Sequence, residues 1–302
     1  MFFALIVTVV FVLMFGGILL FVRSNAYGTT LERSLPRSAG MMLPPENSAE
    51  VLGRIVGLTS RYIIIGAAVT VVYSIVVPLL IGLAPWDLSG AYVGMAGVIV
   101  GLVAGHLNGF ARDVNRRAAN PGPITRPAGV GLSDYLSPFT LVAAAIVAVI
   151  ALGSLVLALY VLVSDFEFDY DRVTISSPVA STVAYASMLL ALGVYVVGIA
   201  LNLRRPQNAV SNIALAWDDA LTSQLMFSGL YITCFIIGIS TNPLYSALVQ
   251  QVPGGGETDG LRTLLFLGAL LLPLTIFALV LSSVLTKPTK RYIKRLWPSL
   301  AG

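Results

Sequence analysis

The chain has 302 residues, of which 57% are hydrophobic and only 11% are charged. A soluble domain has roughly 45–50% apolar and about 25% charged residues, so this composition excludes a soluble globular protein. With one histidine (His106) and one cysteine (Cys234), the chain cannot form an intramolecular disulfide, a CxxC redox pair or a metal site built from several such ligands. We therefore expect a multi-pass membrane protein with no catalytic, cofactor or metal site.

Seven segments are long and apolar enough to cross a bilayer as helices, which takes about 20 residues each. None of them contains Asp, Glu or Lys, and Arg262 lies at the boundary of the last one. No basic residue precedes the first segment and its apolar run fills a full span, which favours a retained helix over a cleaved signal peptide. The predicted fold is all-α, with one membrane domain over residues 1–302. It is a polytopic bundle of seven transmembrane helices at residues 2–22, 62–83, 91–111, 139–163, 179–203, 225–248 and 261–285.

The basic residues are divided unequally between the two sides of this predicted bundle. The side reached after the first helix holds 16 of the 18 Lys and Arg residues and has a net charge of +9, whereas the other side has a net charge of −5. Basic loops stay in the cytoplasm, so we expect the N-terminus outside, the C-terminus inside and a location in the plasma membrane. The asymmetry also explains the basic pI of about 9.3 without a nucleic-acid partner. The predicted cytoplasmic parts are the loops 23–61, 112–138 and 204–224 and the tail 286–302.

A regular glycine pattern marks the third predicted helix. Gly97, Gly101, Gly105 and Gly109 recur every four residues and form one stripe at 3.6 residues per turn. In lipid, small residues let two helices approach each other closely. We favour a packing seam within the chain; a homodimer face and a helix that slides during gating are the alternatives.

His106 follows Gly105 near the predicted cytoplasmic end of this helix. An ionisable residue within a span is a candidate functional residue. The sequence identifies no acidic partner at the same depth, so we interpret His106 as a neutral histidine bonded to a neighbouring helix or to interfacial water. Cys234 is interpreted as a small buried apolar side chain.

The predicted loop 204–224 contains the string RRPQNAVSNIALAWDDALTSQ. Its apolar residues, among them Ile213, Trp217 and Leu221, recur at helical spacing. This predicts an amphipathic helix that lies on the membrane surface or leads into the sixth span. Asp218 and Asp219 point about 100° apart on a helix, so they do not converge on one metal ion, and we expect a solvated polar face. The apolar face would re-enter the membrane surface or dock a cytoplasmic partner.

The C-terminal tail combines basic and aromatic residues. We expect it to anchor the protein at the inner membrane surface, where each basic residue contributes about 1 kcal/mol of attraction to anionic lipid. The anchoring residues would be Lys287, Lys290, Arg291, Lys294, Arg295 and Trp297.

Two short stretches resemble a family of membrane proteins. The string RRPQ…AWDDAL.S at Arg204–Ser223 is similar to a loop of uncharacterised actinobacterial-type multi-pass membrane proteins, in which a basic, proline-containing loop with an acidic pair links two helical hairpins. The string GLSDYLSP at Gly131–Pro138 resembles the loop that precedes it. The resemblance is limited to these two stretches and the hairpin topology, and it implies no particular activity.

Three functions are compatible with these features. Helices without buried charge, a glycine seam and short amphipathic cytoplasmic segments favour a non-enzymatic permease-like or accessory subunit of a membrane assembly. Its partners would be the lipid bilayer and a cytoplasmic or membrane protein. The alternative is a self-sufficient transporter. Ion-coupled transporters usually carry intramembrane acids, and the predicted spans have none, so its solute would be a hydrophobic or neutral small molecule. A membrane-embedded enzyme is the third and least favoured function, because the residues that intramembrane aspartyl and metal proteases require are missing.

The predicted topology can be tested by single-cysteine labelling in a Cys234→Ser background. Because 16 of the 18 basic residues mark one side as cytoplasmic, a membrane-impermeant thiol reagent should label cysteines placed at Ser176 and Thr258 in intact cells. Cysteines at Ser38, Asn120 and Thr289 should react only after permeabilisation. Labelling of position 120 from outside would overturn this orientation.

Overall fold

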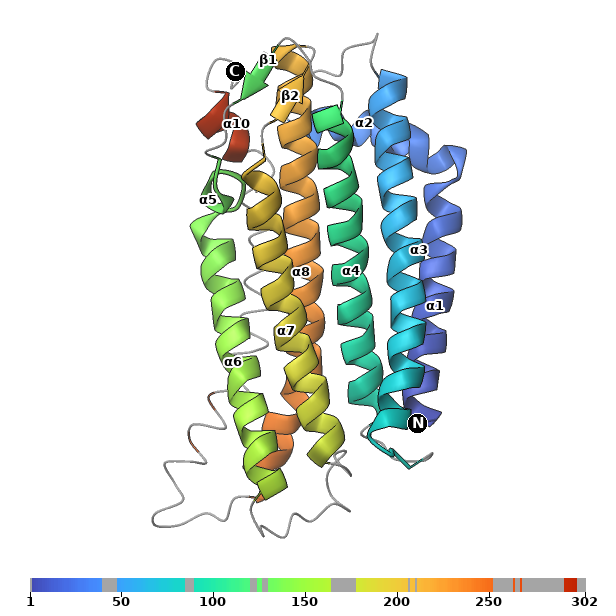
Figure 1. Cartoon of the computed structure of the whole chain (residues 1–302), viewed down its shortest axis with the longest axis vertical. Coiled ribbons are helices and arrows are strands. Elements are labelled where there is room, and N and C mark those ends of the chain that lie inside the picture. Colours follow the sequence, from blue (N-terminus) through green and yellow to red (C-terminus); the bar gives the residue numbers. More distant parts are fainter. Residues whose placement is uncertain are drawn as a thin grey trace.

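The computed structural model describes residues 2–39, 48–84, 90–119, 124–126, 130–163, 178–205, 207–209, 211–251, 263, 267 and 291–297. These residues form a predominantly helical structure (Figure 1). The long helices are α1 (Phe2–Val22), α3 (Ser48–Leu80), α4 (Gly90–Ala119), α6 (Pro138–Val163), α7 (Pro178–Leu203) and α8 (Asn212–Gln251). The short elements are the helices α2 (Asn25–Ala39), α5 (Leu132–Tyr135) and α10 (Arg291–Leu296) and the strands β1 (Ile124–Arg126) and β2 (Gln207–Ala209), which pair antiparallel.

The six long helices run alternately up and down the bundle and form two groups of three (Figure 1). In one group α1, α3 and α4 contact one another, and the contact between α3 and α4 is the most extensive in the structure. In the other group α6, α7 and α8 contact one another. Helix α4 joins the two groups because it also packs against α7 and α8.

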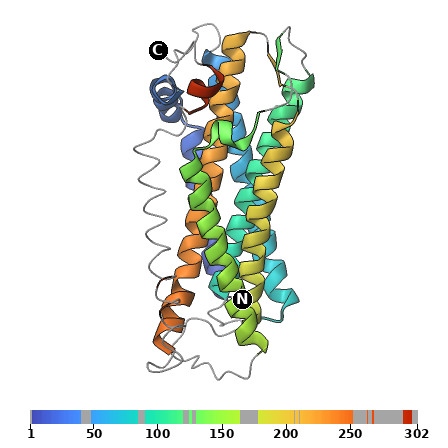
Figure 2. The same cartoon turned by 90° about the vertical axis from the view of Figure 1, so that its left-hand side faces the viewer.

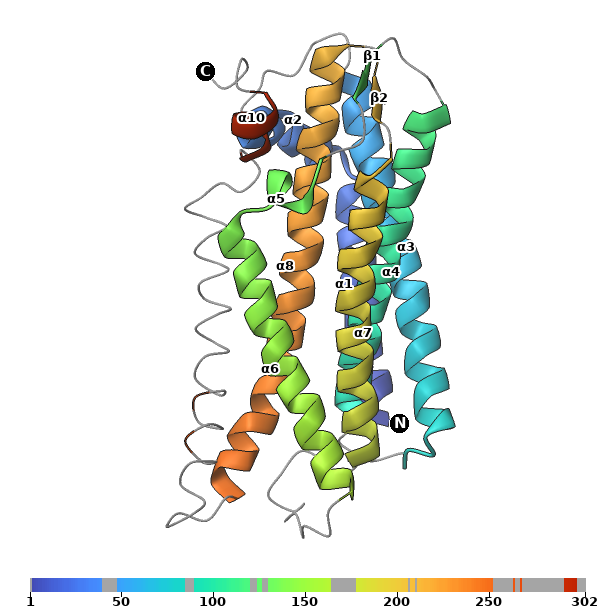
Figure 3. The same cartoon turned by 60° about the vertical axis from the view of Figure 1, so that its left-hand side comes forward.

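The two ends of the bundle differ in character. At one end α1, α4 and α7 finish and α3, α6 and α8 begin, and we call this the polar end. The short helices α2, α5 and α10 and both strands lie at this end (Figures 1 and 2). Helix α8 starts there and runs the length of the bundle (Figure 3).

Among the described residues, six helices are long and apolar enough to cross a membrane. Their outer faces carry large apolar side chains, such as Leu13 and Leu190, which are each 70% exposed. Such a surface suits lipid rather than water, so the structure is that of a multi-pass membrane protein. Apart from two residues, the seventh predicted helix, 261–285, falls outside the described part of the chain.

Several helices extend beyond the predicted spans. Helix α3 begins at Ser48 and α8 at Asn212, so residues predicted as cytoplasmic loops form helical turns. At the start of α8, the side chain of Ser211 accepts a hydrogen bond of 3.1 Å from the backbone N–H of Ala214, which caps the helix. Hydropathy marks only the part of a helix that lies in lipid, and polar residues continue the same helix past it.

The glycine stripe of α4 lies mainly against α3 of the same chain. A Cβ atom at Gly101 would overlap the carbonyl oxygen of Gly66 and the hydroxyl of Thr70, and one at Gly105 would overlap the carbonyl oxygen of Tyr62. At Gly97 the added atom would lie 2.7 Å from the hydroxyl of Ser74. The absence of side chains at these positions therefore sets the close distance between the two helices.

The last glycine of the stripe is different. An ideal Cβ at Gly109 would have no neighbouring atom within 4 Å, apart from its own helix and chain neighbours. The seam thus ends before Gly109, about one turn short of the predicted stripe.

Alanine at Gly101 or Gly105 should destabilise the bundle, because the added methyl group would push α3 away from α4. Overpacking of this kind typically costs about 1–3 kcal/mol. Gly109→Ala is the matched control, because space is open there and alanine favours a helix. Thermal unfolding in detergent should show a lower midpoint for the first two variants only. Equal midpoints for all three variants would show that the close approach does not contribute to stability.

Candidate functional site

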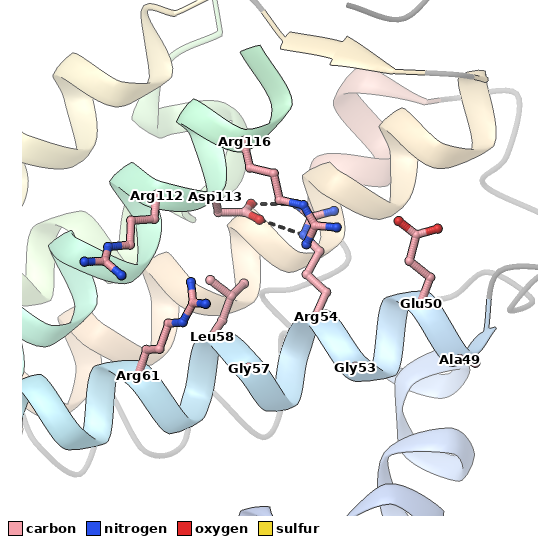
Figure 4. Close-up of a pocket in the computed structure, with 10 residues that line it drawn as sticks. All are labelled: Ala49, Glu50, Gly53, Arg54, Gly57, Leu58, Arg61, Arg112, Asp113 and Arg116. Atoms are coloured by element: carbon pink, nitrogen blue, oxygen red, sulfur yellow. Dashed lines mark hydrogen bonds and ion pairs between the residues drawn. The ribbon is translucent and has the colours of Figure 1, made fainter. Parts of the chain in front are cut away.

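A buried charged cluster lies at the polar end, where three long helices meet. Arg54 of α3 donates from Nε to Asp113 Oδ1 over 2.7 Å and from Nη2 to Asp113 Oδ2 over 2.6 Å. Its Nη1 atom donates to Asp218 Oδ1 of α8. Both aspartates are only 6% exposed. We call these three residues the Arg54 cluster; Figure 4 shows its Arg54–Asp113 pair.

The Arg54 cluster connects the two groups of helices. Arg54 lies in the second turn of α3 and Asp113 in the last turns of α4, which are in the first group, whereas Asp218 belongs to α8 in the second group. The planar guanidinium group has donors in a fixed geometry, so a two-bond contact with a carboxylate restricts orientation as well as distance. The cluster therefore fixes the positions of three helix ends relative to one another.

Asp219, the next residue along α8, has different partners. Its Oδ1 atom accepts a 2.7 Å hydrogen bond from the hydroxyl of Tyr135, and its Oδ2 atom accepts a 2.7 Å bond from Nε1 of Trp297. Asp219 is fully buried. The pKa of the nearby Tyr292 is raised, mainly by the burial of its own hydroxyl and further by the negative charge of Asp219. These contacts hold α5 and the end of α10 against the first turns of α8 (Figure 3).

The expectation of a solvated polar face at Asp218 and Asp219 is wrong, because both carboxylates are buried. Their divergence on the helix was predicted correctly, and it directs each of them to a separate set of partners. Trp217 and Leu221, predicted on the apolar face, are also buried, at 3% and 5% exposure, whereas Ile213 is 51% exposed. The first turns of α8 are therefore packed inside the polar end rather than lying along a membrane surface.

The sequence could not identify the partners of the acidic pair. Arg54, Tyr135 and Trp297 lie about 80 residues or more from it along the chain, and no periodic pattern links them. One feature of the sequence did argue against a solvated face. The Trp-Asp-Asp string lies inside an otherwise apolar helical pattern, which leaves no wide polar face.

The tail residues that the structure describes contact the protein itself. Arg295 forms a 3.3 Å ion pair with Asp134 and is half exposed. Trp297 donates to Asp219, as described above. Lys287 and Lys290 lie outside the described residues, as do the side chains of Arg291 and Lys294. For these four residues, lipid anchoring stays a prediction.

His106 lies where α4 meets α3, α7 and α8. Its Nδ1 atom is 2.9 Å from the carbonyl oxygen of Leu102, one turn earlier in the same helix. The ring stacks on Tyr62 at a centroid distance of 4.5 Å and meets Tyr195 edge-on at 6.3 Å. The Tyr195 hydroxyl in turn donates to the carbonyl oxygen of Met226 over 3.2 Å. His106 is thus part of an aromatic contact between helices. Its described polar contact is within α4 and not with a neighbouring helix, and a bond to interfacial water stays a prediction.

Other candidate chemistry is sparse in this part of the molecule. Among the described residues, no three His, Cys, Asp or Glu side chains gather in a group that could hold a metal ion. Cys234 is fully buried, as the sequence predicts. The polar end therefore holds the densest set of charged contacts that the structure describes.

The chain matches no protein-family model, and searches of curated proteins and of solved structures likewise give no match. The fold and the polar end define a class, that of multi-pass helical membrane proteins.

Replacing Arg54 should destabilise the structure strongly. Arg54→Met would leave two buried carboxylates without their shared partner, and breaking a buried pair in this way typically costs about 3–5 kcal/mol. Arg61→Met, two turns further along α3, is the matched control, because Arg61 is exposed. Thermal unfolding in detergent should show a large loss for the first variant and little for the second.

The same experiment can separate charge pairing from packing. Adding Asp113→Asn and Asp218→Asn to Arg54→Met removes the two buried carboxylate charges, so the unfolding midpoint should partly recover. A further decrease in the triple variant would show that the volume of Arg54, not its charge, stabilises the polar end.

Proposed function

We propose that the chain is a non-enzymatic component of a plasma-membrane assembly, either a permease-like or an accessory subunit. In this proposal seven helices cross the bilayer, the polar end faces the cytoplasm and the N-terminus lies outside. The proposal also places the chain beside the actinobacterial-type membrane proteins that it resembles.

The path of the chain supports a seventh crossing. Helix α8 runs from the polar end to the opposite end of the bundle (Figure 3), whereas α10 contacts α5 and α8 at the polar end. Gln251 and Arg291 thus lie at opposite ends of the bundle, and the apolar segment 261–285 is by its length and composition long enough to span that distance. Basic residues of the described part, such as Arg23, Arg112 and Arg204, lie at the polar end, which favours a cytoplasmic location for it.

One observation carries the proposal: the buried acids of the described bundle are used to join helices. Asp113, Asp218 and Asp219 lie at the polar end, each bonded to a side chain from another element. An acid/base catalyst or an ion-coupling acid needs access to a substrate, a proton or an ion. A structural role for these acids favours a subunit over an enzyme or an ion-coupled transporter.

The same end offers a surface for a partner protein. Ile213 projects from the first turn of α8 and is 51% exposed, although the residues from Leu215 to Ser223 are buried. The stretches on which the family resemblance rests meet nearby, through the bond from Tyr135 to Asp219. We propose that this firmly packed region, with Ile213 at its surface, docks the partner.

Extraction of the full chain from its native membrane into polymer-bounded nanodiscs tests this function. The mass of the particles should show a second, different chain in fixed stoichiometry. Ile213→Glu should release that chain, because it places a charge on the apolar contact. Asn212→Glu is the control, since it adds the same charge at an exposed neighbour on another face of the helix.

Two results would contradict the proposal. One is a particle in native membranes that contains this chain alone. The other is uptake of a hydrophobic or neutral solute by proteoliposomes that hold only this chain, which would make it a self-sufficient transporter.

A further inference from the structure

A pocket of about 340 Å³ opens at the polar end between the first turns of α3 and the last turns of α4 (Figure 4). Its volume is within the usual range for ligand pockets, about 300–1,000 Å³. The charged side chains that line it are unbalanced, with four arginines and two acids. They are Arg54, Arg61, Arg112, Arg116, Glu50 and Asp113.

The four arginines have two different roles. Arg54 is already engaged, because three of its five N–H donors bind Asp113 and Asp218. Arg61, Arg112 and Arg116 are exposed, and within the described part of the chain none of these three makes an ion pair. Three guanidinium groups are therefore available to an anion, while the Arg54 cluster fixes the walls from which they project.

Local sequence explains why the three arginines share one space. Arg112 and Arg116 are four residues apart on α4, so they lie on one face, one turn apart. Arg61 projects from the facing helix α3 (Figure 4). On α3, Gly53 and Gly57 leave the surface open, because no atom lies within 4 Å of an ideal Cβ at either position. An occupant can therefore approach the backbone of α3 while the arginines reach it from both helices.

We propose that this pocket binds a phosphate group. A guanidinium group presents parallel N–H donors that match two oxygens of a phosphate, and such bonds are stronger than those between neutral groups. Guanidinium groups from two helices can bind different oxygens of one phosphate, whereas a planar carboxylate has only two oxygens to offer. Glu50 on the rim disfavours multiply charged anions that would extend toward it.

The position of the pocket favours the headgroup of an anionic lipid as the source of the phosphate. Arg61 directly precedes the apolar part of α3, so in a span that begins there the side chain would lie at the level of the lipid headgroups. Ile64, less than one turn further on, is 47% exposed and can contact an acyl chain. Basic pockets between transmembrane helices bind such headgroups in other proteins. A soluble phosphorylated compound shares the same chemistry and is the other source.

Native mass spectrometry of the full chain, ejected from nanodiscs of phosphatidylcholine mixed with phosphatidylglycerol, tests the site. The wild-type chain should retain phosphatidylglycerol above its share of the bilayer. The double variant Arg112→Gln/Arg116→Gln should lose at least about tenfold of this preference, because it removes two charged partners of the phosphate. Both side chains are exposed, so the variant should keep the wild-type unfolding midpoint.

A charge-matched variant provides the control. Arg23→Gln/Arg204→Gln removes two exposed arginines that lie at the same end of the bundle but outside the pocket. It should retain phosphatidylglycerol as the wild-type chain does. Equal losses in the two double variants would overturn the proposal, because they would show general attraction to the polar end. No loss in either variant would exclude the lipid headgroup, and it would overturn the proposal if inorganic phosphate also gave no shift that depends on Arg112 and Arg116.

A second arm distinguishes the two sources of phosphate. Inorganic phosphate is titrated onto the same wild-type and variant chains in neutral detergent, and the shift of the unfolding midpoint is measured. A shift that depends on Arg112 and Arg116 at millimolar concentration would assign the pocket to a soluble phosphate compound. Retention of phosphatidylglycerol without such a shift would assign it to a lipid headgroup.

Discussion

The ion cluster of Arg54 with Asp113 and Asp218 is the interaction on which the arrangement of the polar end depends. It joins α3 and α4 of one helix group to α8 of the other. Burying two carboxylates is unfavourable unless they are paired, so the cluster is stable only when all three helix ends are in place. Its position at one end of the bundle would limit this cost, because the end of a membrane-spanning bundle lies nearer to water and lipid headgroups than its middle does. The same cluster in the middle of a membrane would lose that solvation.

Away from the polar end, the helices are held together by different means. Lipid tails are as apolar as leucine, so burial alone does not drive helices together in a bilayer. Close approach of the backbones replaces it, at Gly101 and Gly105 between α4 and α3. The hydroxyl of Tyr195 occupies the space that a side chain at Gly229 would fill, and so α7 approaches α8. The apolar part of the bundle is thus organised by missing side chains and the polar end by charged ones.

Whether the sequence predicts a feature depends on how far apart along the chain its residues lie. A span is a continuous apolar run and the glycine stripe is a periodic pattern, and each lies within one helix. The sequence therefore predicts them, although Gly109 lies beyond the seam. The bonds from Tyr135 and Trp297 to Asp219 join segments far apart in the chain, and no local pattern records them. For that reason Asp219 resembles a solvated residue in the sequence, and its burial emerges only from the packing. Hydropathy does not show that α3 and α8 continue past their apolar stretches, because it reports the solvent and not the backbone. For α8, the helical spacing of Ile213, Trp217 and Leu221 does predict a helix that leads into the span.

The arginines show why a total charge is a poor guide to function. The excess of basic residues on one side of the chain is sufficiently explained by membrane orientation, and on that basis all of them are equivalent. The structure separates them by their partners: Arg54 is bound by two carboxylates, Arg295 by Asp134, and Arg61, Arg112 and Arg116 face a pocket. Orientation requires only that the charges be present, not that three of them line one open pocket from two helices beside two glycines. This shared lining favours the proposed phosphate site over a purely topological role for these arginines.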